Sequence, residues 1–521
     1  MEYNQPSEIV KDLSFGESAS EKIISGVDKL ANAVKSTLGA SGKCVIYEDA
    51  LGKPVITKDG VTVAESVVLY DPVENMGATL IKEAAKNTVK EAGDGTTTST
   101  VLAQSLLRQA KNALDNGVKI RELHDAYNSG LDFVNTYLDK NKIEVEGSML
   151  RDVATISTNN DLVLGSMISE AYNKVGKHGV VLMEESESET TYFEIVDGVQ
   201  FDSGLKSPHL ATNEDNDKSE LENPYILIVA SPIPSIRKIQ AVLEHVIKEK
   251  RSLLIVAEVE QQPYAALLTN KVKGNIKINI VDVPGFGSTK RDTIEDLAAL
   301  TGATIIDEQL GDDLDLIQPE VLGEAIKSVT DANSTVITIE TVPQEALDRI
   351  DTVQKKIQNE TNPYIKKKLE QRLAMLSGSV GIIKVGANSK VELKEKKDRV
   401  EDAIYAVKAA LQEGIVPGGG VALINAIQKM NSKDNVDLYF QRALLSPFST
   451  ILENAGIEVP SDFTYRKGWG INVITGKPVN MIKAGIIDPV LVTKTALKNA
   501  VSVVNTIISA DCVISNKRIE Q

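Results

Sequence analysis

Residues 225–257 read YILIVASPIPSIRKIQAVLEHVIKEKRSLLIVA, in which an amphipathic segment separates two short apolar runs. The alternation continues along the chain, with strands expected at 225–230, 253–257, 276–283 and 304–306 and helices expected at 236–248, 264–271 and 293–300. Apolar runs that alternate with amphipathic helices are typical of a parallel sheet covered by helices. The centre of the chain is therefore predicted to be an α/β domain.

The sequence on both sides of this segment is mainly helical in pattern. Apolar residues recur at helical spacing over 20–38, 75–91 and 97–114, and short strand-like pieces lie at 43–47 and 54–57. Two amphipathic segments at 347–357 and 365–376 are separated by Asn362-Pro363 and predict an antiparallel helical hairpin. The helical pattern returns from Arg399 onward. A chain of 521 residues has room for three or four domains of this mixed kind.

The composition is acidic, with 57 Lys and Arg against 73 Asp and Glu and a formal net charge of −16. This charge argues against binding to nucleic acid or to anionic membrane surfaces. Cys44 and Cys512 stand alone, so neither a disulfide framework nor a zinc site is indicated, and a reducing compartment fits. The first twenty residues do not have the pattern of a targeting peptide, and the apolar runs are too short to span a bilayer. We expect a soluble, cytoplasmic protein.

A short glycine- and threonine-rich segment, Gly93-Asp94-Gly95-Thr96-Thr97-Thr98, directly precedes a helical run. The unpaired N–H groups at a helix N-terminus favour anions, and glycines let the backbone approach a phosphate closely. A carboxylate at Asp94 would repel phosphate unless it holds Mg²⁺, which bridges both kinds of oxygen. The alternative is a hairpin turn at Asp94-Gly95 followed by an N-cap, and these residues alone leave both interpretations open.

Two further glycine-rich turns occur, at 37–42 and 416–421. Each is a weak signal by itself, because glycine ends many helices. Neither matches G-x-x-x-x-G-K-[ST] or a strand-bound G-x-G-x-x-G, so the common nucleotide-binding fingerprints are absent.

Taken together and in this order, the motifs resemble those of the GroEL-type (group I, 60-kDa) chaperonins, as a divergent member. The segments that carry the resemblance span nearly the whole chain: Thr37-Leu38-Gly39, Ile56 to Ala64, Gly93 to Thr98 with Val101-Leu102-Ala103, Pro284 to Gly287, Arg399 to Ala403, and Gly418 to Leu423.

The resemblance implies a multidomain α and α/β fold. It predicts a mainly helical equatorial domain (1–140 and 412–521), a small α+β intermediate domain (141–196 and 380–411) and an α/β apical domain (197–379). It also implies an ATPase that forms a homo-oligomeric ring, usually of seven subunits. Such a ring encloses unfolded protein clients under a co-chaperonin lid, driven by ATP with Mg²⁺ and K⁺.

The resemblance assigns a nucleotide site residue by residue. The phosphates and ions would be held by Thr37, Leu38, Gly39, Ala40, Lys58, Asp94, Gly95, Thr96, Thr97 and Thr98, with Asp94 on Mg²⁺ and Thr37, Lys58 and Thr97 around K⁺. The base and ribose would be contacted by Gly419, Asn472, Val473, Ile474 and Asp488.

Asp59 and Asp402 match the pair that positions the attacking water. Carboxyl groups with an ordinary pKa of about 3.9 are ionised at neutral pH and are poor proton acceptors. We therefore expect the pair mainly to orient water in line with the γ-phosphate. Without the motif, Asp402 would be interpreted as a solvated helix residue.

The resemblance also implies a surface that holds clients and the lid, formed by Leu205, His209, Leu210, Gln240, Leu243, Tyr264, Leu268 and Thr269. Exposed apolar groups mark a binding surface, but periodicity does not distinguish Leu243 or Leu268 from core residues. Several positions depart from the family pattern: Ala40 replaces a proline, Val473 and Ile474 replace two alanines beside the base, Ser379 replaces a hinge glycine, and His209, Gln240 and Thr269 are more polar than usual. These departures predict crowding at the base and a weaker grip on clients.

Two other functions are compatible with parts of the sequence. A scaffold or holdase of the same fold would bind proteins without a productive ATP cycle. A small-molecule kinase or ligase would also use ATP, but no recognised fingerprint of either is present.

Overall fold

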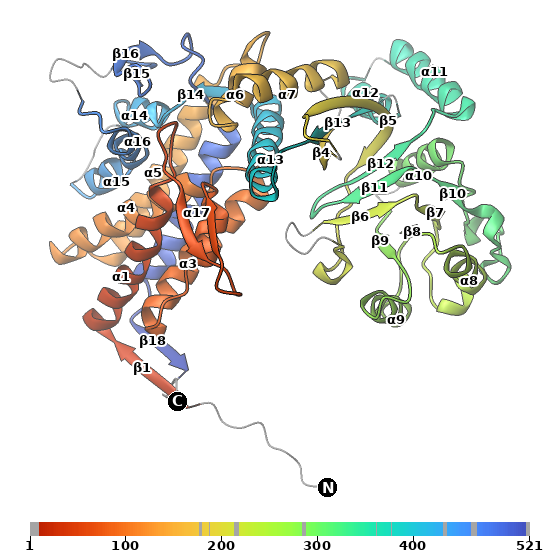
Figure 1. The fold of residues 1–521 in the computed structure, drawn as a ribbon, viewed down its shortest axis with the longest axis horizontal. Coiled ribbons are helices and arrows are strands. Elements are labelled where there is room, and N and C mark those ends of the chain that lie inside the picture. The colour runs from red at the N-terminus through yellow and green to blue at the C-terminus, as the bar shows by residue number, and fades with distance from the viewer. Residues whose placement is uncertain are drawn as a thin grey trace, which may run out of the picture. The chain divides into compact units, whose positions relative to one another are not determined.

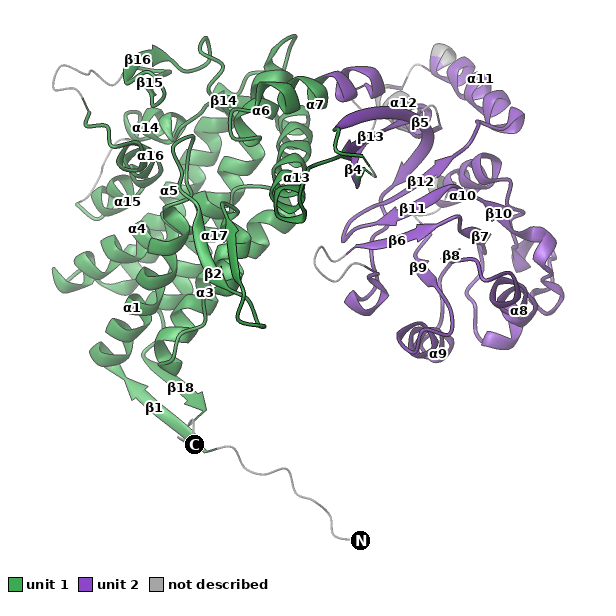
Figure 2. Ribbon diagram, viewed as in Figure 1, with its two compact units in different colours: residues 1–169, 185–190, 385–521 green, residues 170–184, 191–384 purple. Residues whose placement is uncertain are grey.

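The computed structural model describes residues 10–176, 180–186, 188–212, 218–283, 288–360, 362–376, 378–430, 435–459 and 466–516. The chain forms two compact units, shown in different colours in Figure 2. Unit 1 comprises residues 1–169, 185–190 and 385–521, and unit 2 comprises residues 170–184 and 191–384. Both ends of the chain therefore build one unit, and the central segment builds the other. The division into equatorial, intermediate and apical domains stays a prediction.

Unit 1 is mainly helical, as its periodicity predicts. Its helices are α1 (Gly16–Lys35), α2 (Gly60–Ser66), α3 (Pro72–Ala92), α4 (Thr96–Asp115), α5 (Ile120–Asn141), α6 (Met149–Ser157), α13 (Lys390–Glu413), α14 (Val421–Ile427), α15 (Asp437–Ala443), α16 (Ser446–Ala455) and α17 (Val490–Ile508). Helix α7 (Leu162–Val175) begins in unit 1 and ends in unit 2. The core of unit 1 contains Leu30, Ile81, Leu102 and Leu497, which have no exposed surface. Residues three or four apart share a helix face, so each helix buries one stripe.

Within the described residues, four short antiparallel sheets complete unit 1. They pair β1 (Lys11–Phe15) with β18 (Cys512–Asn516), β2 (Val45–Glu48) with β3 (Pro54–Thr57), β14 (Ile415–Pro417) with β17 (Ile487–Pro489), and β15 (Trp469–Asn472) with β16 (Lys477–Asn480). Figure 1 shows β1 and β18 side by side. The β14–β17 pair matters for the site, because it brings two distant glycine-rich and acidic segments together.

The α/β prediction for the centre of the chain is confirmed in unit 2. Strands β7 (Tyr225–Ile228), β8 (Leu253–Val256) and β9 (Ile278–Val281) are parallel, and β10 (Gly323–Glu324) pairs antiparallel with β7. Helices α8 (Gln240–Glu249) and α9 (Gln261–Val272) pack on one face and α10 (Ser288–Thr301) on the other, as Figure 1 shows. The strand expected at 304–306 is wrong, since only a single bridge joins Ile306 to Val229.

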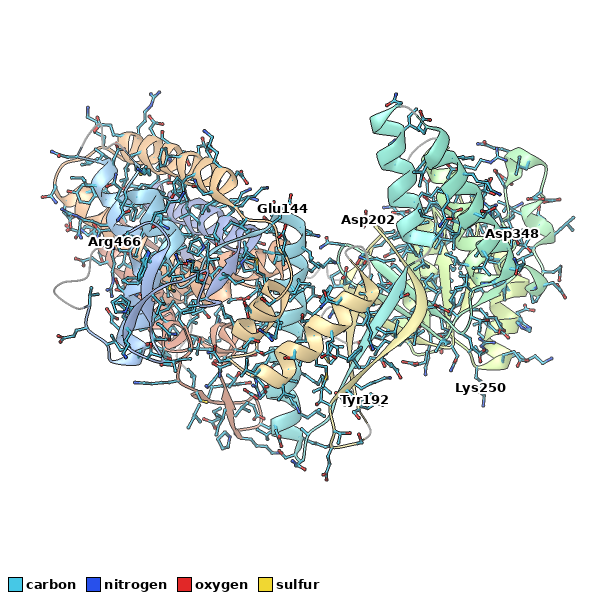
Figure 3. All side chains as sticks on the ribbon, turned by 90° about the horizontal axis from the view of Figure 1, so that it is seen from above. Glu144, Tyr192, Asp202, Lys250, Asp348 and Arg466 are labelled. Atoms are coloured by element: carbon cyan, nitrogen blue, oxygen red, sulfur yellow. The ribbon has the colours of Figure 1, made fainter. Side chains whose placement is uncertain are left out.

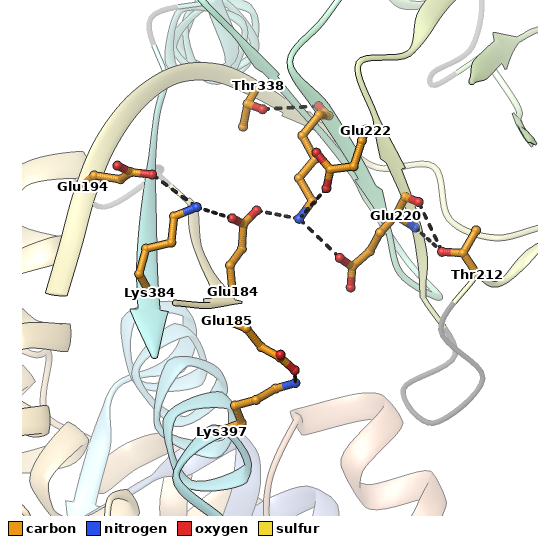
Figure 4. A network of polar contacts seen from close by, with 10 residues as sticks. Glu184, Glu185, Glu194, Thr212, Glu220, Glu222, Thr338, Lys384 and Lys397 are labelled. Atoms are coloured by element: carbon orange, nitrogen blue, oxygen red, sulfur yellow. Dashed lines mark hydrogen bonds and ion pairs between the residues drawn. The ribbon is translucent and has the colours of Figure 1, made fainter. Parts of the chain in front are cut away.

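A second sheet in unit 2 has six strands in the order β4-β13-β5-β12-β11-β6. The strands are β4 (Val180–Glu185), β5 (Tyr192–Phe201), β6 (Ser219–Glu222), β11 (Lys327–Thr330), β12 (Thr335–Ile339) and β13 (Ser379–Val385). Glu184 on β4 and Lys327 on β11 are separated by three intervening strands, yet their charged atoms lie 2.6 Å apart. Figure 4 shows Glu184 among the polar contacts of this sheet. In a flat sheet the two strands would be roughly 19 Å apart, so the sheet is strongly curved.

The predicted helical hairpin is present as α11 (Gln344–Asn359) and α12 (Pro363–Leu376). Asp296 of α10 has no exposed side-chain surface and accepts two hydrogen bonds from Arg372 of α12, at 2.6 and 2.7 Å. This buried pair ties the hairpin to α10.

Charged side chains lie on the surface of both units. Glu144 and Arg466 of unit 1 and Lys250 and Asp348 of unit 2 are exposed and are labelled in Figure 3. Among the residues that the structure describes, no helix combines the length and the apolar character needed to cross a bilayer.

Candidate functional site

The glycine- and threonine-rich segment joins two helices of unit 1. Helix α3 ends at Ala92, α4 begins at Thr96, and Gly93 and Gly95 between them have φ angles of +75° and +98°. This left-handed conformation costs glycine little and other residues more. The hairpin interpretation of Asp94-Gly95 is therefore wrong. No side chain caps the N-terminus of α4, so its first N–H groups are free for an anion.

Two helices pack directly against this turn. A β-carbon built on Gly93 would lie 2.3 Å from Cβ of Tyr405 on α13. A β-carbon built on Gly95 would lie 2.8 Å from Cγ1 of Val492 on α17. The backbone of the turn is thus fixed from both sides, with α13 held close to Asp94.

Asp59 lies at the N-terminus of α2, where it caps the helix. Its carboxylate accepts hydrogen bonds from the Val61 amide (3.1 Å), the Thr62 amide (2.7 Å) and the Thr62 hydroxyl (2.6 Å). A β-carbon on the next residue, Gly60, would lie 2.3 Å from Oγ1 of Thr97. The N-termini of α2 and α4 therefore meet, and Asp59 lies beside the glycine- and threonine-rich turn at Gly93 to Thr98.

Thr37 and Lys58 lie at the same place. The Thr37 and Thr97 hydroxyl oxygens are 3.4 Å apart. The side chain of Lys58 is half-buried, and no described residue forms a hydrogen bond or ion pair with it. A free ammonium group and paired hydroxyl oxygens suit a site for phosphate and a monovalent cation.

The turn that contains Thr37 to Ala40 is anchored by Asn454 of α16. The Asn454 amide donates to the carbonyl oxygens of Lys35 (2.8 Å) and Leu38 (2.9 Å). Gly39 has a φ angle of +83°, and Ala40 is exposed. This part of the predicted site is ordered by contacts within unit 1.

Asp94 and Asp402 interact electrostatically across the gap between the turn and α13. Burial raises the pKa of Asp402 well above its ordinary value, and the charges of Asp94 and Asp59 raise it further. Burial also raises the pKa of Asp94, the Gly95 amide opposes this by donating a hydrogen bond, and the Asp59 charge adds to the rise. The expectation of an ordinary pKa is therefore wrong for Asp402.

No described residue donates a hydrogen bond to Asp402 or forms an ion pair with it. Carboxylates that are partly buried and unpaired are costly unless a cation joins them. Within the described part of the chain, no three His, Cys, Asp or Glu side chains form a metal site by themselves. Mg²⁺ commonly takes one or two carboxylates together with substrate phosphates, and Asp94 at the uncapped end of α4 fits that donor set.

Asp488 and Gly419 meet through the β14–β17 pair. A β-carbon on Gly418 would lie 2.9 Å from Oδ1 of Asp488. Burial raises the pKa of Asp488 to about 6, the Asp94 charge adds to this, and the Gly419 amide opposes it. The electrostatic interaction with Asp94 places Asp488 at the same site.

The three remaining predicted base contacts lie on or beside the β15–β16 hairpin. The side-chain oxygen of Asn472 accepts a hydrogen bond from the Ile474 amide (2.9 Å), so the turn itself uses this oxygen. Val473 packs against a small core that includes Phe448. The side chain of Ile474 is 70% exposed, so it does not fill a pocket around a base.

Sequence reasoning missed Asp398. This residue lies four positions before Asp402 on α13, so the two side chains share a helix face. Burial raises the pKa of Asp398 to about 6, and the Asp59 charge raises it further, against Lys394. The four-residue spacing from Asp402 was a signal that could have found it.

The predicted client residues lie in unit 2, and the structure divides them. Leu210 has no exposed surface and Leu243 is 9% exposed, both within the core under α8 and α9. Leu205, Tyr264 and Leu268 are half-buried, and His209, Gln240 and Thr269 are exposed.

Polar contacts dominate the exposed part of this surface. The Gln240 amide donates to Glu244 (2.7 Å), and the Lys271 ammonium donates to the His209 carbonyl oxygen (2.7 Å). Two exposed apolar residues there, Ile247 at 52% and Val272 at 66%, were not predicted. The motif Pro284 to Gly287 lies outside the described residues.

Comparison with known proteins gives two findings. A family model described as the TCP-1/cpn60 chaperonin family matches residues 30–518. Two crystal structures of the chaperonin gp146 from the bacteriophage EL 2 (Pseudomonas aeruginosa), both in the presence of ATP-BeFx, match with TM-scores of 0.73 and 0.66. Each is 22% identical to this chain and covers 97% of it and 99% of the solved chain. The similarity in fold extends over nearly the full length of both proteins.

Proposed function

Because this chain belongs to the TCP-1/cpn60 chaperonin family, we propose that it is a ring-forming subunit that hydrolyses ATP to drive protein folding. The observation that carries the proposal is the meeting of three carboxylates, Asp59, Asp94 and Asp402, at the uncapped N-terminus of α4. A chaperonin of the same fold was solved in the presence of ATP-BeFx, which supports a nucleotide site in this chain.

In the proposed mechanism the amide groups of α4 and the Lys58 ammonium bind the phosphates. Asp94 would hold Mg²⁺, which would supply positive charge to neutralise the phosphates. Thr37 and Thr97 would supply hydroxyl oxygens for K⁺. Gly419 and Asp488 contact the base and ribose from the β14–β17 side.

Asp59 and Asp402 divide the work on the attacking water. Asp59 is fixed by three hydrogen bonds from α2, so it serves as a rigid orienting group. Asp402 has free lone pairs, and burial together with repulsion by Asp94 raises its pKa. A carboxylate with a raised pKa accepts a proton better, so Asp402 is the general base of the pair.

Assembly and client capture complete the proposal. The two short sheets β1–β18 and β2–β3 each expose an apolar face, which supports burial of these faces in a ring of identical subunits. The surface of α8 and α9, with Ile247 and Val272 beside polar groups, supports a client site with a weaker apolar grip.

The first experiment measures ATP turnover by the purified protein with Mg²⁺ and with a chelator. Turnover is expected only with Mg²⁺, and Asp402→Asn is expected to lower kcat about 100-fold because it removes the general base. ATP binding by this variant should stay within about threefold of wild type. Glu413→Gln is the matched control, since it neutralises a carboxylate on the same helix that pairs with Lys494 instead.

Wild-type turnover by Asp402→Asn would refute the role of Asp402. If the wild-type protein suppresses aggregation of an unfolded client without turning over ATP, it is a holdase of the chaperonin fold rather than an ATPase. Elution as a monomer in size-exclusion chromatography would contradict the ring.

A further inference from the structure

Asp398 is a carboxylate at the proposed site to which neither the motifs nor the family match assigns a role. It lies on α13 four residues before Asp402, so about one helical turn separates the two side chains. Residues at this spacing have β-carbons roughly 6 Å apart, close enough for one water molecule to join the two carboxyl groups.

The charged groups around Asp398 leave it without a partner. On its own helix lie Lys394, Lys397 and Glu401, and from the N-terminus of α2 it faces Asp59. Lys397 is paired with Glu185 at 2.5 Å, and no described residue forms a hydrogen bond or ion pair with Asp398.

The other neighbour, Asp59, is not available to carry a proton away. Both of its oxygens already accept hydrogen bonds from α2, one from the Val61 amide and the other from the Thr62 amide and hydroxyl. Asp398 has unoccupied lone pairs, and its side chain is only half-buried, so it reaches solvent. Of Asp59 and Asp398, the latter is therefore better placed to exchange a proton with water.

We propose that Asp398 is a positioning residue for the hydrolysis, which takes the proton of the attacking water from Asp402 and releases it to solvent. The inference rests on the proposed ATPase function. As the water oxygen bonds to the γ-phosphorus, the bond to the bridging oxygen of ADP breaks and the water proton moves to Asp402. The proton then passes to Asp398 and to bulk water, so the products are ADP, inorganic phosphate and one proton.

The electrostatics of the residue agree with this role. Burial and the Asp59 charge raise the pKa of Asp398 to about 6. A group whose pKa lies near neutral pH both accepts and releases protons readily under working conditions. Because the relay needs ionised Asp398, kcat should rise as the pH increases through this range.

The test compares Asp398→Asn, Asp398→Glu and Glu401→Gln with the wild type in steady-state ATPase assays over about pH 5 to 8. In Asp398→Asn we expect kcat to fall about tenfold at neutral pH, KM for ATP to stay within about twofold, and the rise near pH 6 to be lost, because an amide does not ionise. Asp398→Glu should restore most of kcat. Glu401→Gln removes a negative charge that raises the pKa of Asp398, so its profile should keep the wild-type rise but at lower pH.

The outcomes separate this inference from the proposed function. If the wild type shows no Mg²⁺-dependent turnover, both the ATPase function and the proton relay are refuted. Turnover by the wild type with an unchanged kcat and pH profile in Asp398→Asn would overturn the relay alone, as would a loss confined to KM. If Asp398→Asn fails to assemble, the wild-type profile and Asp398→Glu decide the matter: absence of a rise near pH 6, or a glutamate profile that does not shift, counts against the relay.

Discussion

The residues of the proposed site come from four separate parts of unit 1. Asp59 caps α2, Asp94 follows the left-handed Gly93, Asp402 lies on α13, and Asp488 lies on β17. Their charges repel one another, which raises the pKa of Asp402 in addition to its burial. Repulsion between these carboxylates destabilises the site, and a bound cation would relieve it.

Gly93 offers a direct test of how α13 is positioned. A β-carbon there would lie 2.3 Å from Tyr405, in addition to the strain of a φ angle of +75°, so Gly93→Ala should displace α13 from the turn. We expect kcat for ATP to fall at least about tenfold, since small displacements of reacting groups are costly. The measurement is ATP turnover together with thermal unfolding.

The matched control is Gly117→Ala, because Gly117 has a φ angle of +84° but no atom within 4 Å of a built β-carbon. Both variants carry a strain of about 1 kcal/mol, and only Gly93→Ala adds the clash. Adding Tyr405→Gly to Gly93→Ala should restore part of the turnover, because it removes the Cβ atom that lies 2.3 Å from the built β-carbon. Equal behaviour of the two glycine variants would show that Tyr405 does not set the position of α13.

At the scale of residues, the sequence predicted which carboxylates belong to the site but not how far their pKa values are shifted. The resemblance of the motifs identified Asp59, Asp94 and Asp402, and unit 1 brings all three together. Their pKa shifts arise from burial and from charges far away in sequence, which no local pattern contains. Asp398 was missed for the same reason, since its position facing Asp59 depends on how α13 packs.

At the scale of elements, a network of ion pairs joins separate strands of the curved six-stranded sheet in unit 2. Lys327 of β11 lies 2.6 Å from Glu184 of β4 and within 3.3 Å of Glu220 and Glu222 of β6, and Glu184 also binds Lys384 of β13 at 2.6 Å (Figure 4). The side chains of Lys327 and Glu184 are only 11% and 15% exposed. When an ion pair is this well shielded from water, removing one partner is strongly destabilising because the other charge stays buried.

Lys327→Met should therefore destabilise unit 2 by about 3 kcal/mol, because it leaves the shielded carboxylate of Glu184 without one of its two cations. Hydrogen exchange should increase in β4 and β11, and the thermal unfolding midpoint should fall. Lys355→Met is the control, since its pair with Asp351 is 69% and 60% exposed and should contribute less than about 0.5 kcal/mol. Equal effects of the two substitutions would mean that the network contributes little.

The same network predicts a pH dependence of known sign. Burial would raise the pKa of Glu184, but hydrogen bonds and charges from Lys327 and Lys384 outweigh it, and the pKa is lowered from 4.5. A lowered pKa stabilises the fold at all pH values above 4.5, and this contribution is lost as the pH falls through the lower folded-state value. In Glu184→Gln the acid-induced loss of β4 protection should be smaller than in the wild type.

The elements themselves were predicted from periodicity to different degrees. The parallel strands β7, β8 and β9 and the α11–α12 hairpin follow from local patterns, and both are confirmed. The six-stranded sheet was not predicted, because β4 and β13 are neighbours in it although nearly 200 residues lie between them in sequence. Residues 304–306 looked like a strand because they are apolar, but they make only one bridge.

At the scale of the whole molecule, two small sheets of unit 1 expose apolar faces that a lone subunit would leave in water. On β1–β18 the cross-strand pair Leu13 and Ile514 is 50% and 56% exposed, and Phe15 on the same face is 59% exposed. On β2–β3 the pair Ile46 and Ile56 is 68% and 51% exposed. Two-stranded sheets are marginal on their own, and their free edges pair readily with another chain.

These faces predict that assembly of the proposed ring depends on the small sheets rather than on the nucleotide site. Ile46→Lys should shift the protein from a large particle towards monomers in native mass spectrometry, because a charge would be buried at the contact. Leu13→Lys should act in the same way if the two faces meet between neighbouring subunits. Val68→Lys, at a residue 74% exposed elsewhere in unit 1, should leave assembly unchanged. If Ile46→Lys and Leu13→Lys both assemble like the wild type, the ring contacts lie elsewhere, and the exposed pairs on β1–β18 and β2–β3 need another explanation.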